Sequence, residues 1–226
     1  MRFVRVFRPV VALLLAVCLI VTGFGCSTPA AEKKLATSES IETARPIRVV
    51  DDAGKAITLQ KPARRVVSLA PSNTEIMFAL GAGDSLVGVS SLCNYPPEAA
   101  SKEKVGDFFN PNLEKILSLK PDLVLAVAGV QASAVKSLEE AGIAVATLDP
   151  TSLGEVQEDF RKIGLLVGKK REGERLAREL ENVVERLRAK NVPPRRVFFE
   201  ISNQPLMSPG ANTFISDAIA AAGGIN

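Results

Sequence analysis

The 226-residue sequence contains no histidine. This absence excludes Ser-His-Asp and Cys-His catalysis, the HExxH metalloprotease pattern, and zinc or haem ligation through imidazole. Tryptophan is also missing, and tyrosine occurs once, at Tyr95. Neither a GxxxxGKS/T nor a GxSxG motif is present, so the sequence carries no recognisable catalytic signature.

Cysteine is scarce as well, with Cys18, Cys26 and Cys93 as its three occurrences. Cys18 lies within an apolar N-terminal run and Cys26 directly follows it. If that run is removed as an export signal and Cys26 carries lipid, Cys93 remains alone. A single cysteine cannot form an internal disulfide, even in an oxidising compartment.

Residues 1–25 have the form of an export signal. Arg2, Arg5 and Arg8 precede an apolar run at 10–21, which is short of the roughly 20 residues that span a bilayer. The following Gly-Phe-Gly-Cys resembles a bacterial lipobox, so we expect acylation of Cys26 and a lipid anchor in the cell membrane, facing the periplasm or the outside. The alternative is ordinary cleavage and a soluble periplasmic product. Residues 26–46 are polar and read as a flexible tether.

The signal also accounts for the basic charge of the chain. It holds three Arg and no acid, so the formal net charge of +3 becomes 3 − 3 = 0 without it. We therefore expect no nucleic-acid partner.

Residues 47–150 have the pattern of an α/β lobe. A hairpin is predicted at 47–50 and 56–59, strands at 66–69, 86–89, 123–127 and 144–148, and helices at 73–80, 112–119 and 131–141. The strands are apolar on both faces, which is typical of a parallel sheet covered by helices on both sides.

Residues 151–192 are predicted to be linking helices. Ser152 and Glu155 have capping-box spacing at the start, and the second helix, about 20 residues, would be roughly 30 Å long. Such a helix is either a strut between two lobes or a plain surface helix. In 193–226 a strand at 197–201 and a helix at 212–222 follow, which is too little for a closed α/β layer, so we expect a second lobe that is incomplete.

The loops after the predicted strands are the expected ligand site, because the crevice of a parallel sheet lies beyond the carboxyl ends of its strands. Ser72 and Glu75 also have capping-box spacing, so Ser72 is expected to cap its helix whether or not it meets a ligand. Phe108 and Phe109 either line the crevice rim or pack under the hairpin. The candidate positions in these loops are Pro71, Ser72, Asn73, Leu92, Tyr95, Phe108, Phe109, Val127 and Gly129.

Three segments resemble one family. Residues 65–75 (RVVSLAPSNTE) with 88–90, then 112–124 (NLEKILSLKPDLV), then 222–226 (AGGIN) are similar, in order and spacing, to the cobalamin/iron-siderophore class of ABC-importer binding proteins. The resemblance implies two Rossmann-like α/β lobes joined by a long rigid helix, with ligand held between them. It also implies a monomer that docks on the permease of an importer through one surface Glu per lobe. Glu114 matches the first, and the second would lie beyond Asn226.

The resemblance further implies a ligand that is a metal chelate: a ferric siderophore, a cobalamin or other corrinoid, or haem. Positions matching aromatic cobalamin contacts are Leu92, Phe108, Val127 and Met207, of which only Phe108 is aromatic, and this argues against cobalamin. Haem-binding relatives often ligate iron through Tyr or His, and of these two residue types the chain offers only Tyr95, so haem ranks lower. We expect no catalysis, no metal site and no cofactor of the protein's own. The alternatives are an exported α/β enzyme or a non-functional fragment of a binding protein.

Overall fold

The computed structural model describes residues 45–190 and 192–226. The predicted export signal, Cys26 and most of the tether lie outside these residues. Within the described part, no helix is both long and apolar enough to cross a membrane.

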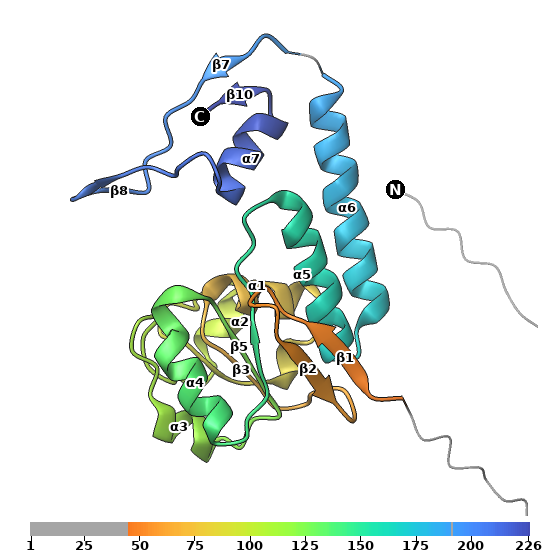
Figure 1. Cartoon of the computed structure of the whole chain (residues 1–226), viewed down its shortest axis with the longest axis vertical. Helices are drawn as coiled ribbons and strands as arrows, with labels where there is room; N and C mark the ends of the chain where they lie inside the picture. Colours follow the sequence, from red (N-terminus) through yellow and green to blue (C-terminus); the bar gives the residue numbers. More distant parts are fainter. Residues whose placement is uncertain (1–44, 191) are drawn as a thin grey trace, which may run out of the picture. The chain divides into compact units, whose positions relative to one another are not determined.

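A four-stranded parallel sheet organises the first part of the described chain (Figure 1). Its strands are β3 (Val66–Ser68), β4 (Leu86–Val89), β5 (Leu123–Ala126) and β6 (Val145–Thr147), in the order β4-β3-β5-β6. All four were predicted from apolar runs. An antiparallel hairpin of β1 (Ile47–Val50) and β2 (Ala56–Leu59) precedes them, as predicted.

The two faces of the sheet carry separate apolar cores. Val66 and Leu123 pack with Met77 of α1 (Pro71–Ala79) and Ile163 of α5 (Leu153–Leu166) on one face. The neighbouring residues Val67 and Val124 pack on the other face with α3 (Leu113–Ser118) and α4 (Ala132–Glu140). Successive strand residues point to opposite faces of the sheet, so residues on both faces must be apolar when helices cover both. This arrangement confirms the α/β architecture expected from the sequence.

The start of α1 corrects one prediction. Its N-cap is Ala70, with Pro71 in the first turn, and no side chain caps the helix. Proline suits this position because its fixed φ is helical and its missing N–H would have no partner there. The helix therefore begins two residues before the predicted boundary, and Ser72 lies inside it as an exposed side chain rather than as a cap.

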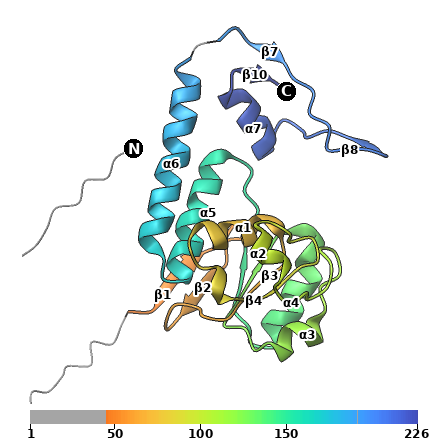
Figure 2. The same ribbon diagram turned by 180° about the vertical axis from the view of Figure 1, so that it is seen from behind.

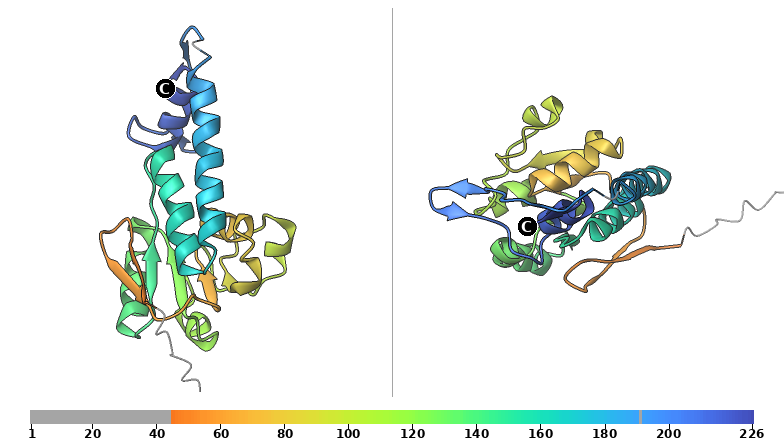
Figure 3. Two further views of the ribbon diagram at one scale, coloured as in Figure 1. Left: turned by 90° about the vertical axis from the view of Figure 1, so that its right-hand side faces the viewer. Right: turned by 90° about the horizontal axis from the view of Figure 1, so that it is seen from above.

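α5 and α6 (Lys170–Arg188) lie side by side (Figures 2 and 3). A Cβ atom on Gly173 would lie 2.5 Å from the carbonyl oxygen of Phe160, so glycine permits the close approach of the two helices. Ser152 caps α5 as predicted, accepting a hydrogen bond from the Glu155 N–H. α6 is a 19-residue helix, close to the predicted length.

The predicted strand at 197–201 is wrong. Regular pairing is confined to β7 (Arg195–Arg196), which lies parallel to β10 (Gly224–Ile225), and the Val197 N–H adds one bond to the Ile225 carbonyl at 2.8 Å. Strand structure needs a neighbouring strand, and residues 198–200 have none among the described residues, while the Ile201 N–H already bonds to the Met207 carbonyl at 2.9 Å. β8 (Ser202–Asn203) and β9 (Leu206–Met207) form a small hairpin. Helix α7 (Phe214–Ala221) matches the predicted helix at 212–222. In the first part of the chain, the short helix α2 (Pro97–Ala100) was not predicted.

Candidate functional site

A pocket of about 530 Å³ opens beyond the carboxyl ends of the parallel strands. The segments after all four strands contribute to it, as the crevice rule requires: helix α1 after β3, and the loops after β4, β5 and β6. Helix α5 closes one side. Its lining is mostly apolar, with polar and acidic groups at a few points. It is formed by Ser72, Asn73, Glu75, Ile76, Ala79, Tyr95, Val127, Leu148, Asp149, Pro150, Val156, Asp159, Phe160 and Phe214.

Four of the predicted ligand residues meet here: Ser72, Asn73, Tyr95 and Val127. Tyr95 is 64% exposed and so presents most of its ring to the pocket mouth and solvent. Asn73 is buried, and its side-chain amide donates to the Ala126 carbonyl at 3.2 Å, at the end of β5. Asn73 therefore joins the start of α1 to the next strand end and shapes the pocket wall.

Gln131 is a positioning residue that sequence reasoning missed. It is 1% exposed, and its side-chain carbonyl accepts from the Val127 N–H at 3.0 Å. Its side-chain amide donates to the carbonyls of Leu69 and Phe108 at 3.0 and 2.9 Å. One buried amide thus holds together three loops at the strand ends. The available signal was a polar residue at the start of a predicted helix, in the short connection that follows a buried strand.

The loop that carries Phe108 and Phe109 lies outside the pocket lining. The two rings form an edge-to-face pair with centroids 5.1 Å apart, and Phe109 is 63% exposed. Asp107 accepts hydrogen bonds from the Phe109 and Asn110 N–H groups, both at 2.7 Å. The bonds from Asn110 and Phe109 lower the pKa of Asp107, so this turn is held by a carboxylate. The two aromatic side chains are therefore available beside the strand ends, and their contact with a ligand stays a prediction.

The remaining predicted ligand residues are dispersed. Gly129 lines a separate recess of about 390 Å³, which Val127 also borders. Leu92 is exposed, and Met207 lies half-exposed on β9. The structure brings neither these residues nor Pro71, at the start of α1, into the lining of the pocket with Ser72 and Tyr95.

Asp159 is the second residue that the sequence analysis missed. It is 1% exposed on α5 and lines the pocket. Burial, followed by the charge of Asp52, raises the pKa of Asp159 to about 7, although Lys162 acts in the opposite direction. Its signal was an acid among the apolar positions Val156 and Ile163 of the same helical face.

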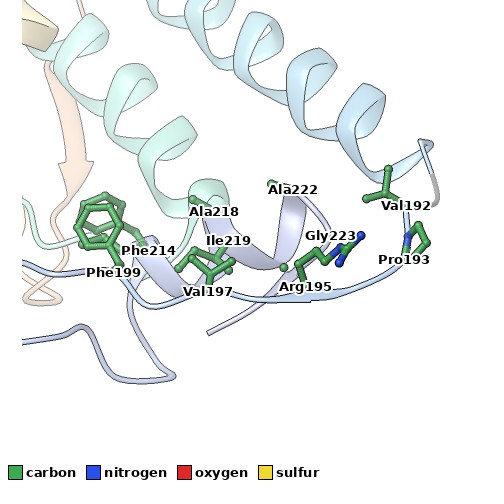
Figure 4. Close-up of a pocket in the computed structure, with 12 residues that line it drawn as sticks. Val192, Pro193, Arg195, Val197, Phe199, Phe214, Ala218, Ile219, Ala222 and Gly223 are labelled. Atoms are coloured by element: carbon green, nitrogen blue, oxygen red, sulfur yellow. The ribbon is translucent and has the colours of Figure 1, made fainter.

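A larger apolar pocket, of about 840 Å³, lies between α7 and the segment leading from Val192 to Phe199 (Figure 4). Val197, Phe199 and Ile219 point into it, and among its described lining residues only Arg195 is charged. A specific ligand site needs a few polar groups that fix orientation. The pocket at the strand ends has them, and this apolar one has almost none.

Glu114, the predicted docking residue, is exposed in the first turn of α3. No ion pair involves it among the described residues. An acid at this place is also favoured by the helix dipole. No grouping of acidic and cysteine side chains in the described part has the geometry of a metal site.

Comparison with known proteins agrees with this architecture. The model of the periplasmic binding protein family matches residues 66–226. The chain belongs to the periplasmic binding protein family. It is 37% identical to an uncharacterized ABC transporter substrate-binding lipoprotein of Bacillus subtilis, over 92% of this chain and 68% of the relative.

Two solved members of the family show the same fold. The periplasmic vitamin B12 binding protein of Vibrio cholerae has a TM-score of 0.66 and 32% identity, over 73% of this chain and 66% of the other. A periplasmic heme-binding protein from Roseiflexus has a TM-score of 0.63 and 35% identity, over 73% of this chain and 65% of the other. The chain thus spans about two thirds of the length of the relatives that it matches.

Proposed function

We propose that this protein is the extracytoplasmic substrate-binding component of an ABC importer, and that it captures a metal chelate in the pocket at the strand ends. The ligand would be a ferric siderophore, a corrinoid or haem. The observation that carries the proposal is the pocket itself, built from α1 and from the loops after β4, β5 and β6 in a chain of the periplasmic binding protein family. Relatives named for vitamin B12 and heme binding support the choice of ligand class.

The chemistry of the pocket favours capture over catalysis. The buried amides of Asn73 and Gln131 are already engaged with backbone carbonyls, so they shape the site rather than face a reacting group. Nucleophilic catalysis needs a nucleophile within hydrogen-bond reach of a base; the sequence has no histidine for a Ser-His or Cys-His pair, and no hydroxyl or thiol of a described residue bonds to Asp159. We therefore propose a receptor without an enzymatic step, and conversion of a bound ligand would instead favour the exported enzyme.

Delivery belongs to the same proposal. Glu114 would meet a basic residue of the permease, as the family resemblance implies, and its exposure leaves it accessible for this contact. Acylation of Cys26 would hold the protein, acting as a monomer, on the membrane beside its permease and ATPase subunits.

Tyr95 makes the binding test direct. It is the single tyrosine of a chain without tryptophan, and it lines the pocket, so ultraviolet emission excited near the tyrosine maximum reports from that wall. We would titrate the full chain with cyanocobalamin, ferrioxamine B and haemin, each an absorbing chelate, and correct for absorbance with free N-acetyltyrosinamide. Saturable quenching by one of them, with a Kd of about 1 μM or below, is expected.

Equilibrium dialysis against the same three chelates provides the independent measurement. Retention of a chelate at a ratio near one per chain, with the ligand recovered unchanged by mass spectrometry, would support a receptor. Neither quenching nor retention for all three would overturn the proposed function.

A further inference from the structure

Asp159 presents one carboxylate oxygen to the pocket. Its Oδ1 lies 3.3 Å from Lys162 Nζ, whereas Oδ2 accepts no hydrogen bond from a described residue. Among the described residues, no fully buried side-chain nitrogen or oxygen lacks a partner. Oδ2 is therefore not fully buried. Because Asp159 lines the pocket, this oxygen is accessible from the pocket.

Lys162 does not neutralise Asp159 fully, because it is shared with Asp52. Lys162 Nζ makes its shorter contact with Asp52 Oδ1, and the other Asp52 oxygen accepts from the Asp149 N–H at 2.6 Å. Burial works to lower the pKa of Lys162, but the hydrogen bond to Asp52 and the two neighbouring carboxylates raise it overall. The ammonium therefore stays charged and faces Asp52, which leaves Asp159 with an unfilled acceptor.

The rest of the pocket carries charge of the same sign. Glu75 and Asp149 also line it, both exposed, and none of its described lining residues is Lys or Arg. The remaining wall is largely apolar, with Ile76, Phe160 and other apolar side chains. A carboxylate brought into this space would meet like charges at low dielectric, whereas an N–H donor would complete the bonding of Asp159.

We propose that Asp159 accepts a hydrogen bond from an N–H group of the ligand, so that the pocket selects neutral or cationic chelates bearing amide or ammonium groups over chelates bearing carboxylates. This inference rests on the proposed function and narrows it. Two ligand classes supply such donors: corrinoids, through their peripheral amides, and siderophores with a free ammonium group. Haem carries two propionates and is disfavoured at this site.

The three chelates named above separate these possibilities. Cyanocobalamin offers primary amides, ferrioxamine B offers one ammonium group in addition to secondary amides, and haemin offers two carboxylates. We expect one of the first two to quench Tyr95 with a Kd at least tenfold below that of haemin, and which of them does so identifies the class of ligand. If haemin binds as tightly as the better of the two, or more tightly, the inference is overturned while the proposed function stands.

Asp159→Asn tests the residue without changing its shape. At pH 8, above the pKa of Asp159, loss of the charge is expected to raise the Kd of an amide ligand about fivefold, and that of an ammonium ligand at least tenfold, because a hydrogen bond to an ionised group is roughly twice as strong as a neutral one. Asp159→Leu removes the acceptor and should weaken both ligands at least tenfold. In either variant the preference against haemin should shrink.

Glu158→Gln is the matched control. Glu158 is the preceding residue on α5, is exposed and pairs with Arg161 at 2.7 Å, and it does not line the pocket. Its variant should bind each chelate as the parent protein does. Unchanged affinities in Asp159→Asn and Asp159→Leu, with circular dichroism showing both folded, would refute the role of Asp159.

Discussion

Gln131→Met replaces the buried amide that joins the strand-end loops with an apolar side chain of similar length. The substitution removes three hydrogen bonds at once and leaves the backbone N–H of Val127 and the carbonyls of Leu69 and Phe108 without their partner. Methionine fills the same volume, so the loss comes from polarity and not from a cavity. The variant therefore isolates the contribution of the amide to the site.

The expected cost follows from the burial of the three orphaned groups. An unpaired buried polar group costs about 1 to 3 kcal/mol. The Leu69 carbonyl lies in a fully buried bond and should bear this cost in full. The bonds to Val127 and Phe108 are part-buried, so water can replace them in part. We expect the free energy of unfolding to fall by about 2 to 4 kcal/mol in total.

Urea unfolding followed by far-ultraviolet circular dichroism measures this loss. Gln60→Met is the matched control, because Gln60 is exposed and its substitution should change the free energy of unfolding by less than about 0.5 kcal/mol. We also expect faster proteolysis in the 107–110 turn, since the Phe108 carbonyl is released. A loss below about 0.5 kcal/mol for Gln131→Met would refute the positioning role.

Three further predictions test separate features. Glu114→Ala should leave chelate affinity unchanged but reduce uptake in cells that hold the cognate permease; normal uptake would contradict the docking role. In the folded protein the pKa of Asp159 is about 7, above its ordinary value of 3.8, so between these pH values the folded state binds more protons than the unfolded state. The free energy of unfolding should therefore fall by about 2 to 4 kcal/mol as the pH rises from 4 to 8. In Asp159→Asn the urea midpoint should depend less on pH between 4 and 8, and an unaltered slope would contradict the raised pKa of Asp159. Ser152→Ala should cost about 1 kcal/mol in urea unfolding, whereas Ser72→Ala should cost almost nothing; equal losses would contradict the cap assignment.

The sheet could be predicted because its residues satisfy both faces at once. Val66 and Val67 enter different cores, and so do Leu123 and Val124, so consecutive positions of a strand are apolar. Such runs are visible in the sequence alone. Two features could not be predicted: the order of the strands in the sheet, and which helices cover which face. Both depend on tertiary packing, which no local sequence pattern encodes.

The candidate site could be predicted only in part. The crevice rule located Ser72, Asn73, Tyr95 and Val127, because it depends on strand ends that the sequence marks. It could not place Leu92 or Met207, since a loop residue faces a pocket only if the tertiary structure turns it there. The strand expected at 197–201 failed for a related reason, because β-structure depends on a neighbouring strand that the local sequence does not specify.

The first hairpin shows how a segment far from the strand ends contributes to the pocket. Asp52, in its turn, donates through its backbone N–H to the Thr147 carbonyl and accepts from the Asp149 N–H, so the turn is fixed to the end of β6. The same side chain draws Lys162 away from Asp159. Because Lys162 Nζ lies closer to Asp52 than to Asp159 Oδ1 and makes no hydrogen bond to Asp159 Oδ2, the position of Asp52 sets how strongly Asp159 attracts an N–H donor. Asp52 is not a lining residue itself, but it also fixes Asp149, which is one, so a change in this turn should alter ligand preference.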